Sequence, residues 1–180
     1  MTSLPAIEQL NQESSENFIK AINTLFETAP PLARRLLDHR PYTSYSELID
    51  YAEKVCLGNE LDEQEKLEVM NAHPRIGASK AGLSANSLKE QGYNSHTSTL
   101  STQDQEVNAE LAKLNQAYED QYGFKFVVFV NGRPRHEIIP IIKERMASNS
   151  HEKELRTGIT DMMLIARDRL KKATFESSKI

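Results

Sequence analysis

The chain has 180 residues, of which 27% are charged and 38% are apolar, and its formal net charge is −4 at pH 7. A chain of this length and composition fits one globular domain, which buries roughly 70% of its unfolded surface. The 22 basic residues are scattered among 26 acidic ones, so no nucleic-acid-binding face is expected. No apolar run approaches the ~20 residues that span a bilayer, and the N-terminus lacks the regions of a secretory signal. The single cysteine, Cys56, cannot form an internal disulfide, which favours a reducing compartment.

Prolines divide the start of the chain into two predicted helices. The first is predicted from about Ser15 to Ala29, because large apolar residues recur there at helical spacing. Pro30 and Pro31 end this helix, and a proline at the first helical position favours a short second helix opened by Pro31. Pro41 closes that second helix.

Capping residues delimit the next two predicted helices. Ser44-Tyr45-Ser46-Glu47 has the pattern of a capping box, and Gly58 stands where the helix that it opens should end. Asp62 opens the following helix, which runs toward His73. That helix must break before Pro74, since the residue before a proline disfavours helical geometry.

A long polar stretch, residues 75–102, separates these helices from the rest of the chain. It has no sustained period, and a stretch of this length inside a compact domain is more often functional than idle. The clearest helix follows, from Asp104 to Tyr122, with Gly123 at its C-cap.

Phe124 to Val130 is the only strand-like segment, and it has no evident partner strand. We therefore interpret it as a buried extended connection. Pro140 is expected in the first turn of a helix ending near Met146, and the last helix opens at Asn149 or Ser150. The predicted fold is all-α: one domain over residues 1–180, with orthogonal or bundle-like helical packing and one short extended segment.

His73 is the histidine whose setting best suits catalysis. It ends a predicted helix, where the dipole favours a protonated ring, and Pro74 turns the chain away and displays the imidazole. The alternative is a helix-capping histidine. No two histidines have the spacing of a helical zinc site and Cys56 stands alone, so no metal site is predicted.

A second candidate lies in the polar stretch. Ser87, Glu90 and Gln91 would share one face of a helical turn. Their hydroxyl, carboxylate and amide groups can bind a polar ureido compound and orient a histidine. The alternative is a solvated surface turn with a partial capping box.

Arg169 is the third candidate, because it shares the apolar stripe of the last predicted helix. A guanidinium on such a stripe is costly unless an anion meets it. That anion is either an internal carboxylate or a bound substrate, and the sequence leaves both alternatives open.

Taken together, these sites resemble the 2-oxo-4-hydroxy-4-carboxy-5-ureidoimidazoline (OHCU) decarboxylases of urate degradation. The resemblance covers nearly the whole chain, from Leu4 to about Leu170. Each motif alone is a weak signal, whereas their order and spacing are specific. In chain order they are Leu10-Asn11 with Phe18, Arg40-Pro41-Tyr42, His73-Pro74-Arg75-Ile76-Gly77, Ser87-x-x-Glu90-Gln91, Leu114-Asn115 with Tyr118, Gly123-Phe124-x-Phe126-Val127-Val128, and Arg169-Leu170.

The resemblance implies a helical homodimer that converts OHCU, a small-molecule substrate, into (S)-allantoin. No cofactor or metal is expected, because the ring of such a substrate can itself accept the electrons of the departing carboxylate. His73 is then the catalytic acid/base and Glu90 its catalytic partner. The implied substrate-binding residues are Pro74, Ser87, Gln91, Val127, Val128, Phe129 and Arg169.

Two other functions stay open: a helical hydrolase of another ureido compound, and a non-catalytic helical adaptor. A metal-dependent hydrolase would need converging ligands that the spacing does not supply. The chain ends Ser178-Lys179-Ile180, close to the Ser-Lys-Leu signal of peroxisomal import. We therefore expect a peroxisomal enzyme, with an ordinary solvated terminus in a cytoplasmic enzyme as the alternative.

Overall fold

The computed structural model describes residues 3–75 and 102–175. Two compact units can be distinguished: residues 1–72 with 159–180 form the first, and residues 73–158 form the second. Helix α9 (His151–Lys172) contributes its beginning to the second unit and its end to the first. Each unit is described by itself below, and a single domain over residues 1–180 stays a prediction.

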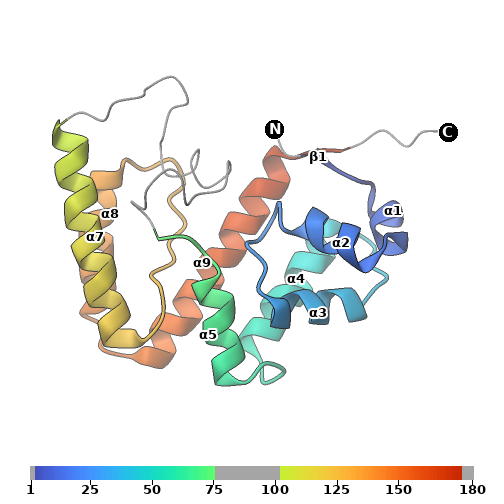
Figure 1. Ribbon diagram of the computed structural model, residues 1–180, viewed down its shortest axis with the longest axis horizontal. Coiled ribbons are helices and arrows are strands. Elements are labelled where there is room, and N and C mark those ends of the chain that lie inside the picture. The colour runs from blue at the N-terminus through green and yellow to red at the C-terminus, as the bar shows by residue number, and fades with distance from the viewer. Residues whose placement is uncertain (1–2, 76–101, 176–180) are drawn as a thin grey trace. The chain divides into compact units, whose positions relative to one another are not determined.

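The first unit is built almost entirely from helices (Figure 1). A two-residue strand at each end, β1 (Ser3–Leu4) and β2 (Thr174–Phe175), adds one short parallel pairing, with Ser3 opposite Thr174. This pairing was not predicted, but two residues a strand are too few for an independent sheet. The helices wholly within this unit are α1 (Ile7–Gln12), α2 (Ser15–Ile22), α3 (Pro30–Asp38), α4 (Tyr45–Leu57) and α5 (Glu63–Asn71).

Side-chain caps start α4 and α5 where the sequence predicted. The Ser44 hydroxyl accepts a hydrogen bond from the Glu47 amide at 3.1 Å. The Glu47 carboxylate, however, binds the amide and hydroxyl of Thr43, both at 2.6 Å, so only half of the predicted capping box forms. The complete box is at α5, where Asp62 and Glu65 each bind the other's amide.

The predicted helix from Ser15 to Ala29 is too long, because α2 ends at Ile22. The Ile22 carbonyl accepts hydrogen bonds from the amides of both Leu25 and Phe26, each at 2.9 Å, and the chain turns there. This turn keeps Leu25 and Phe26 in the core of the unit. Helix α1 precedes α2 and was not predicted.

Cys56 lies in the core of the first unit, as its apolar neighbours predicted. Its side chain is buried, and that burial raises the pKa of the thiol to about 12. The thiol is therefore a packing group and not a nucleophile. The same core contains the fully buried Leu10, Phe18, Ile22, Leu25, Leu36, Leu48, Ile49 and Met70.

The second unit contains α7 (Thr102–Tyr122) packed against α8 (Arg135–Met146), and the two helices lie side by side (Figure 1). Gly123 ends α7 as predicted, with a φ of +83° that favours glycine. Pro140 lies inside α8, so its predicted place in the first turn is wrong. The helix starts earlier because Pro134, which has no amide hydrogen to satisfy, occupies the N-cap.

The segment that follows α7, residues 124–130, forms no strand and is confirmed as a buried connection. Phe124, Phe126, Val127, Val128 and Val130 are all buried. The rings of Phe124 and Phe126 meet the Tyr118 ring edge-on, with centroids 5.9 and 5.3 Å away. Across both described stretches of the chain, no helix is long and apolar enough to span a membrane.

Candidate active site

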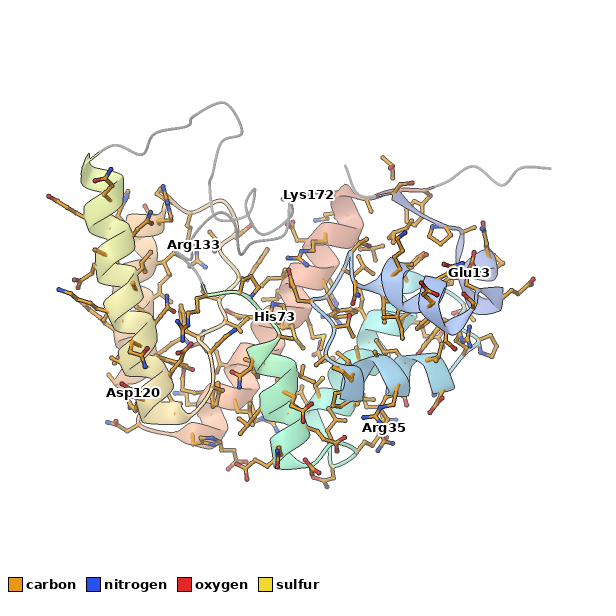
Figure 2. All side chains as sticks on the ribbon, viewed as in Figure 1. Glu13, Arg35, His73, Asp120, Arg133 and Lys172 are labelled. Carbon is orange, nitrogen blue, oxygen red and sulfur yellow. The ribbon has the colours of Figure 1, made fainter. Side chains whose placement is uncertain are left out.

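His73 follows the end of α5 directly after its C-cap, Ala72, and belongs to the second unit (Figure 2). The helix stops before Pro74, as predicted. His73 is only 4% exposed, so the imidazole faces the protein interior rather than bulk water. A buried imidazole is shielded from water, which strengthens its electrostatic interactions with nearby groups.

Arg75 anchors the chain beyond His73 to α7. Its guanidinium forms a two-point contact with the Glu119 carboxylate, with Nε and Oε1 2.7 Å apart. The contact with Glu119 raises the pKa of Arg75. Because nearly half of the Arg75 side chain is exposed, such a pair adds little stability, typically about 0–1 kcal/mol. Its main effect is to hold Arg75, two residues after His73, against α7.

The predicted substrate-binding segment, Val127 to Phe129, is held through its carbonyl groups. Arg145 donates to the Val127 carbonyl at 2.6 Å. Arg133, labelled in Figure 2, donates to the carbonyls of Phe129 and Val130. Sequence reasoning did not identify either arginine.

Other backbone groups of the same segment have no partner in the described part of the chain. These groups are the amides of Val127 and Val128 and the carbonyl of Val128. A buried polar group without a partner costs about 1–3 kcal/mol, so a polar ligand that binds these groups would recover that free energy. A role of this segment in substrate binding stays a prediction.

Arg169 lies in the first unit and is 6% exposed. Its Nη2 binds Glu27 Oε1 at 3.0 Å, and its Nη1 contacts the other Glu27 oxygen and the Leu25 carbonyl at 3.3 and 3.2 Å. The internal carboxylate that the sequence left open is therefore Glu27. A role of Arg169 in substrate binding stays a prediction.

Thr28, next to Glu27, is a polar residue that sequence reasoning missed. Its hydroxyl oxygen is buried and has no hydrogen-bond partner among the residues described. Neither Glu27 nor Thr28 stands in a motif, and only the turn after α2 brings Glu27 to Arg169.

The predicted site residues are distributed as follows. His73, Pro74 and the segment Val127 to Phe129 belong to the second unit, and Arg169 belongs to the first. Ser87, Glu90 and Gln91 lie outside the described residues. The structure thus places the predicted acid/base and the predicted ring-binding backbone in one compact unit.

The family model of OHCU decarboxylase matches residues 11–171 of the chain. The chain belongs to the OHCU decarboxylase family. Proteins with sequences similar to this chain include OHCU decarboxylases. The "2-oxo-4-hydroxy-4-carboxy-5-ureidoimidazoline decarboxylase" of Halalkalicoccus jeotgali is 28% identical over 176 residues, which cover 97% of this chain and 94% of that protein.

Longer relatives match as well. The "Uric acid degradation bifunctional protein" of Bacillus sp. (strain TB-90) is 32% identical over 166 residues, covering 91% of this chain. The chain spans only 31% of that protein and 32% of the bifunctional protein PucL of Bacillus subtilis. The OHCU decarboxylase region is therefore one part of those bifunctional proteins.

Two solved structures have the same fold. A crystal structure of OHCU decarboxylase in the presence of (S)-allantoin has a TM-score of 0.64 at 22% identity, covering 89% of this chain and 97% of that one. A crystal structure of (S)-allantoin synthase has a TM-score of 0.63 at 19% identity, and the match covers 93% of this chain and 54% of that one. These similarities confirm the predicted all-α fold of an OHCU decarboxylase.

Proposed function

We propose that this protein is a carboxy-lyase that converts OHCU into (S)-allantoin in urate degradation. The observation that carries the proposal is the family match over residues 11–171. Similarity over nearly their whole length to decarboxylases such as that of Halalkalicoccus jeotgali supports it.

The reaction needs no cofactor in this proposal, because the substrate accepts its own electrons. The bond between the ring carbon and the carboxylate breaks, and its electron pair moves toward the neighbouring imine. CO2 leaves, the carbon that carried it becomes a carbonyl as its hydroxyl proton passes to the former imine nitrogen, and a proton delivered to one face of the former imine carbon sets the stereocentre of allantoin. The protein must hold the carboxylate away from water, orient the ring and supply that proton.

His73 is the residue that we propose to move the proton. Imidazole ordinarily titrates near neutrality, which suits proton transfer under physiological conditions. Its burial in the second unit supports a water-poor site. Glu90 is proposed as its partner, which would hold the proton and fix the ring tautomer, and Ser87 and Gln91 as ligands of the ureido group.

Val127, Val128 and Phe129 are proposed to bind the substrate ring through their backbone. A ureidoimidazoline ring presents both carbonyl acceptors and N–H donors. The amides of Val127 and Val128 can donate to acceptor oxygens such as the 2-oxo group of the ring, and the Val128 carbonyl can accept from a ring N–H. The lack of partners for these groups in the described part of the chain supports this proposal.

Arg169 is proposed as a ligand of the substrate's negative charge, with Glu27 holding the guanidinium in place. Its two-point contact with Glu27 supports a preorganised cation, since the planar fork of arginine loses little freedom on binding a second anion.

The test is a stereochemical assay. OHCU is generated from urate by urate oxidase and hydroxyisourate hydrolase, and circular dichroism follows the product. We expect a growing signal of (S)-allantoin, because spontaneous decay gives the racemate and no lasting signal. A flat trace with folded protein would exclude the decarboxylase. A metal-dependent hydrolase would instead lose its activity on chelation, and an adaptor would show no turnover.

We also propose that the protein is a homodimer, which rests on the family resemblance alone. Light scattering after size-exclusion chromatography tests it, with the 20.4 kDa chain as the reference mass. A mass of one chain at micromolar concentration would contradict it.

Import into peroxisomes stays a prediction, with the cytoplasm as its alternative. Ser178-Lys179-Ile180 lie outside the described residues. The test is an N-terminal fluorescent fusion in the host cell, with and without Ile180. Punctate fluorescence that becomes diffuse without Ile180 would support import, and diffuse fluorescence in both would contradict it.

A further inference from the structure

A buried ionic network lies in the second unit, among α7, α8 and the beginning of α9. Glu154 is 2% exposed, and its Oε1 accepts hydrogen bonds from Arg145 Nε at 2.8 Å and from the Tyr118 hydroxyl at 2.9 Å. Its Oε2 accepts one from the Ser148 hydroxyl at 3.2 Å. Burial raises the pKa of the Tyr118 phenol well above its ordinary value, so this group stays protonated and can donate.

The network reaches the predicted ring-binding segment through Arg145. Its Nη1 donates to the Val127 carbonyl at 2.6 Å, while its Nε stays on Glu154. The same guanidinium lies over the Phe126 ring, 4.7 Å from the centroid. Three features therefore fix the orientation of Arg145: a carboxylate, a carbonyl and an aromatic face.

Fixing the Val127 carbonyl also fixes the next amide. The peptide bond is planar, so the carbonyl of Val127 and the N–H of Val128 point in opposite directions within one rigid plane. A hydrogen bond to the carbonyl also polarises the amide on the other side of the plane and makes it a stronger donor. That Val128 amide has no partner in the described part of the chain.

A purely structural role would explain this arrangement poorly. Buried ion pairs are weak contributors to net stability, because the cost of removing two charges from water offsets their attraction. In some proteins they serve instead to fix one defined geometry. Here the geometry that is fixed is that of the Val127–Val128 peptide plane. The Val128 amide of this plane is the group that we assign to the substrate ring.

We propose that Arg145 is a positioning residue of the decarboxylase, which orients and polarises the Val128 amide toward the substrate through the Val127–Val128 peptide plane. Glu154, which also accepts a hydrogen bond from Tyr118, holds the guanidinium in the orientation that this requires. The inference rests on the proposed function, in which the backbone of Val127 to Phe129 binds the ring.

Substitutions with matched controls test the role of the guanidinium. Arg145→Met should lower kcat/KM about 100-fold, the effect expected when a binding group is displaced by about 1 Å. Lys143→Met removes a cation from the same turn of α8, where Lys143 forms an exposed contact with Glu110, and it should stay within twofold. Ile142→Ala removes a fully buried side chain from α8 and controls for lost stability; assayed while folded, it should stay within threefold.

A milder variant covers the case in which Arg145→Met does not fold. Glu154→Gln keeps the shape of the side chain and its acceptor oxygen, but it weakens the contact with Arg145, since charge-assisted hydrogen bonds are roughly twice as strong as neutral ones. We expect kcat/KM to fall about tenfold in this variant, because Arg145 and therefore the Val128 amide would be oriented less firmly. If folded Arg145→Met or Glu154→Gln stays within threefold of wild type, or if Ile142→Ala loses as much activity, the inference is wrong.

Nuclear magnetic resonance separates this inference from the function on which it rests. In ¹⁵N-labelled wild-type protein, (S)-allantoin should shift the Val128 amide resonance on titration. In Glu154→Gln the same titration should require several times more allantoin. If the wild-type resonance does not respond, the proposed ring-binding segment is wrong. If wild type and Glu154→Gln respond at the same allantoin concentration, the segment stands and the positioning role of Arg145 is refuted.

Discussion

Replacing Arg169 by leucine should destabilise the protein, although leucine suits the apolar stripe on which Arg169 lies. The apolar stripe taken by itself suggests the opposite, because it does not reveal the partner of the guanidinium. In the structure the Arg169 side chain is 5% exposed, and it binds Glu27, which is 17% exposed. Leucine would remove the hydrogen bonds that Arg169 donates to the Glu27 carboxylate and to the Leu25 carbonyl.

The size of the effect follows from the burial of the pair. Removing one partner of a buried ion pair typically costs about 3–5 kcal/mol, because the other charge stays buried without compensation. Glu27 retains some contact with water, which places Arg169→Leu near the lower end, at about 3 kcal/mol. Replacing both partners by apolar residues of similar volume is often neutral, so Arg169→Leu/Glu27→Leu should regain most of the loss.

Urea denaturation measures these free energies of unfolding, and the stereochemical assay measures activity in the same three proteins. If Arg169 binds substrate, the double variant is stable and inactive. If it regains both stability and activity, Arg169 is only a structural partner of Glu27. A single variant as stable as wild type would refute the reasoning on the buried pair.

Three further predictions follow from the sequence and the structure. Cys56 should resist iodoacetamide at pH 8 in the folded protein and react after denaturation, because a thiol with a pKa of about 12 has on the order of 10⁻⁴ thiolate at that pH; rapid native alkylation would contradict its burial. Gly58→Ala should lower the free energy of unfolding by about 1–3 kcal/mol, since a Cβ there would lie 2.9 Å from the Lys54 carbonyl oxygen; an unchanged urea midpoint would contradict this. Decarboxylation should survive exhaustive treatment with EDTA, and a loss that one specific metal restores would overturn the proposed chemistry.

Local signals predicted the helix boundaries that depend on neighbouring residues. Ser44 and Asp62 cap the helices that they were expected to open, and Gly123 ends α7 with a positive φ. Ser150, one of the two predicted starts of the last helix, accepts from the amide of Lys153. These positions were predictable because a cap satisfies amides within the same turn of chain.

Boundaries set by packing were not predictable in the same way. The pattern from Ser15 to Ala29 continues past Ile22 because Leu25 and Phe26 are buried, but they are buried in a turn and not in a helix. An apolar side chain gives the same signal in either conformation. Propensity and periodicity are overridden there by tertiary contacts.

In the candidate site, too, features set by neighbouring residues could be predicted and features set by tertiary packing could not. His73 was accessible from the sequence because it stands beside a proline at a helix end. The partners of Arg169 and Arg145 were not. Glu27 is 142 residues from Arg169, and Glu154 follows Arg145 at a spacing of nine, which no helical period favours. Pairs of this kind are found only when the fold brings the side chains together.

The measurement that tests the central claim most directly is a pair of circular-dichroism progress curves, for wild type and His73→Asn, with OHCU generated in the cuvette. We expect the wild type to produce the lasting signal of (S)-allantoin. His73→Asn, folded by its far-ultraviolet spectrum, should lose about 10²–10⁴-fold in rate, the usual contribution of a general acid/base. A His73→Asn curve that follows the wild type would show that His73 is not the catalytic acid/base, and a wild-type curve without signal would contradict the decarboxylase itself.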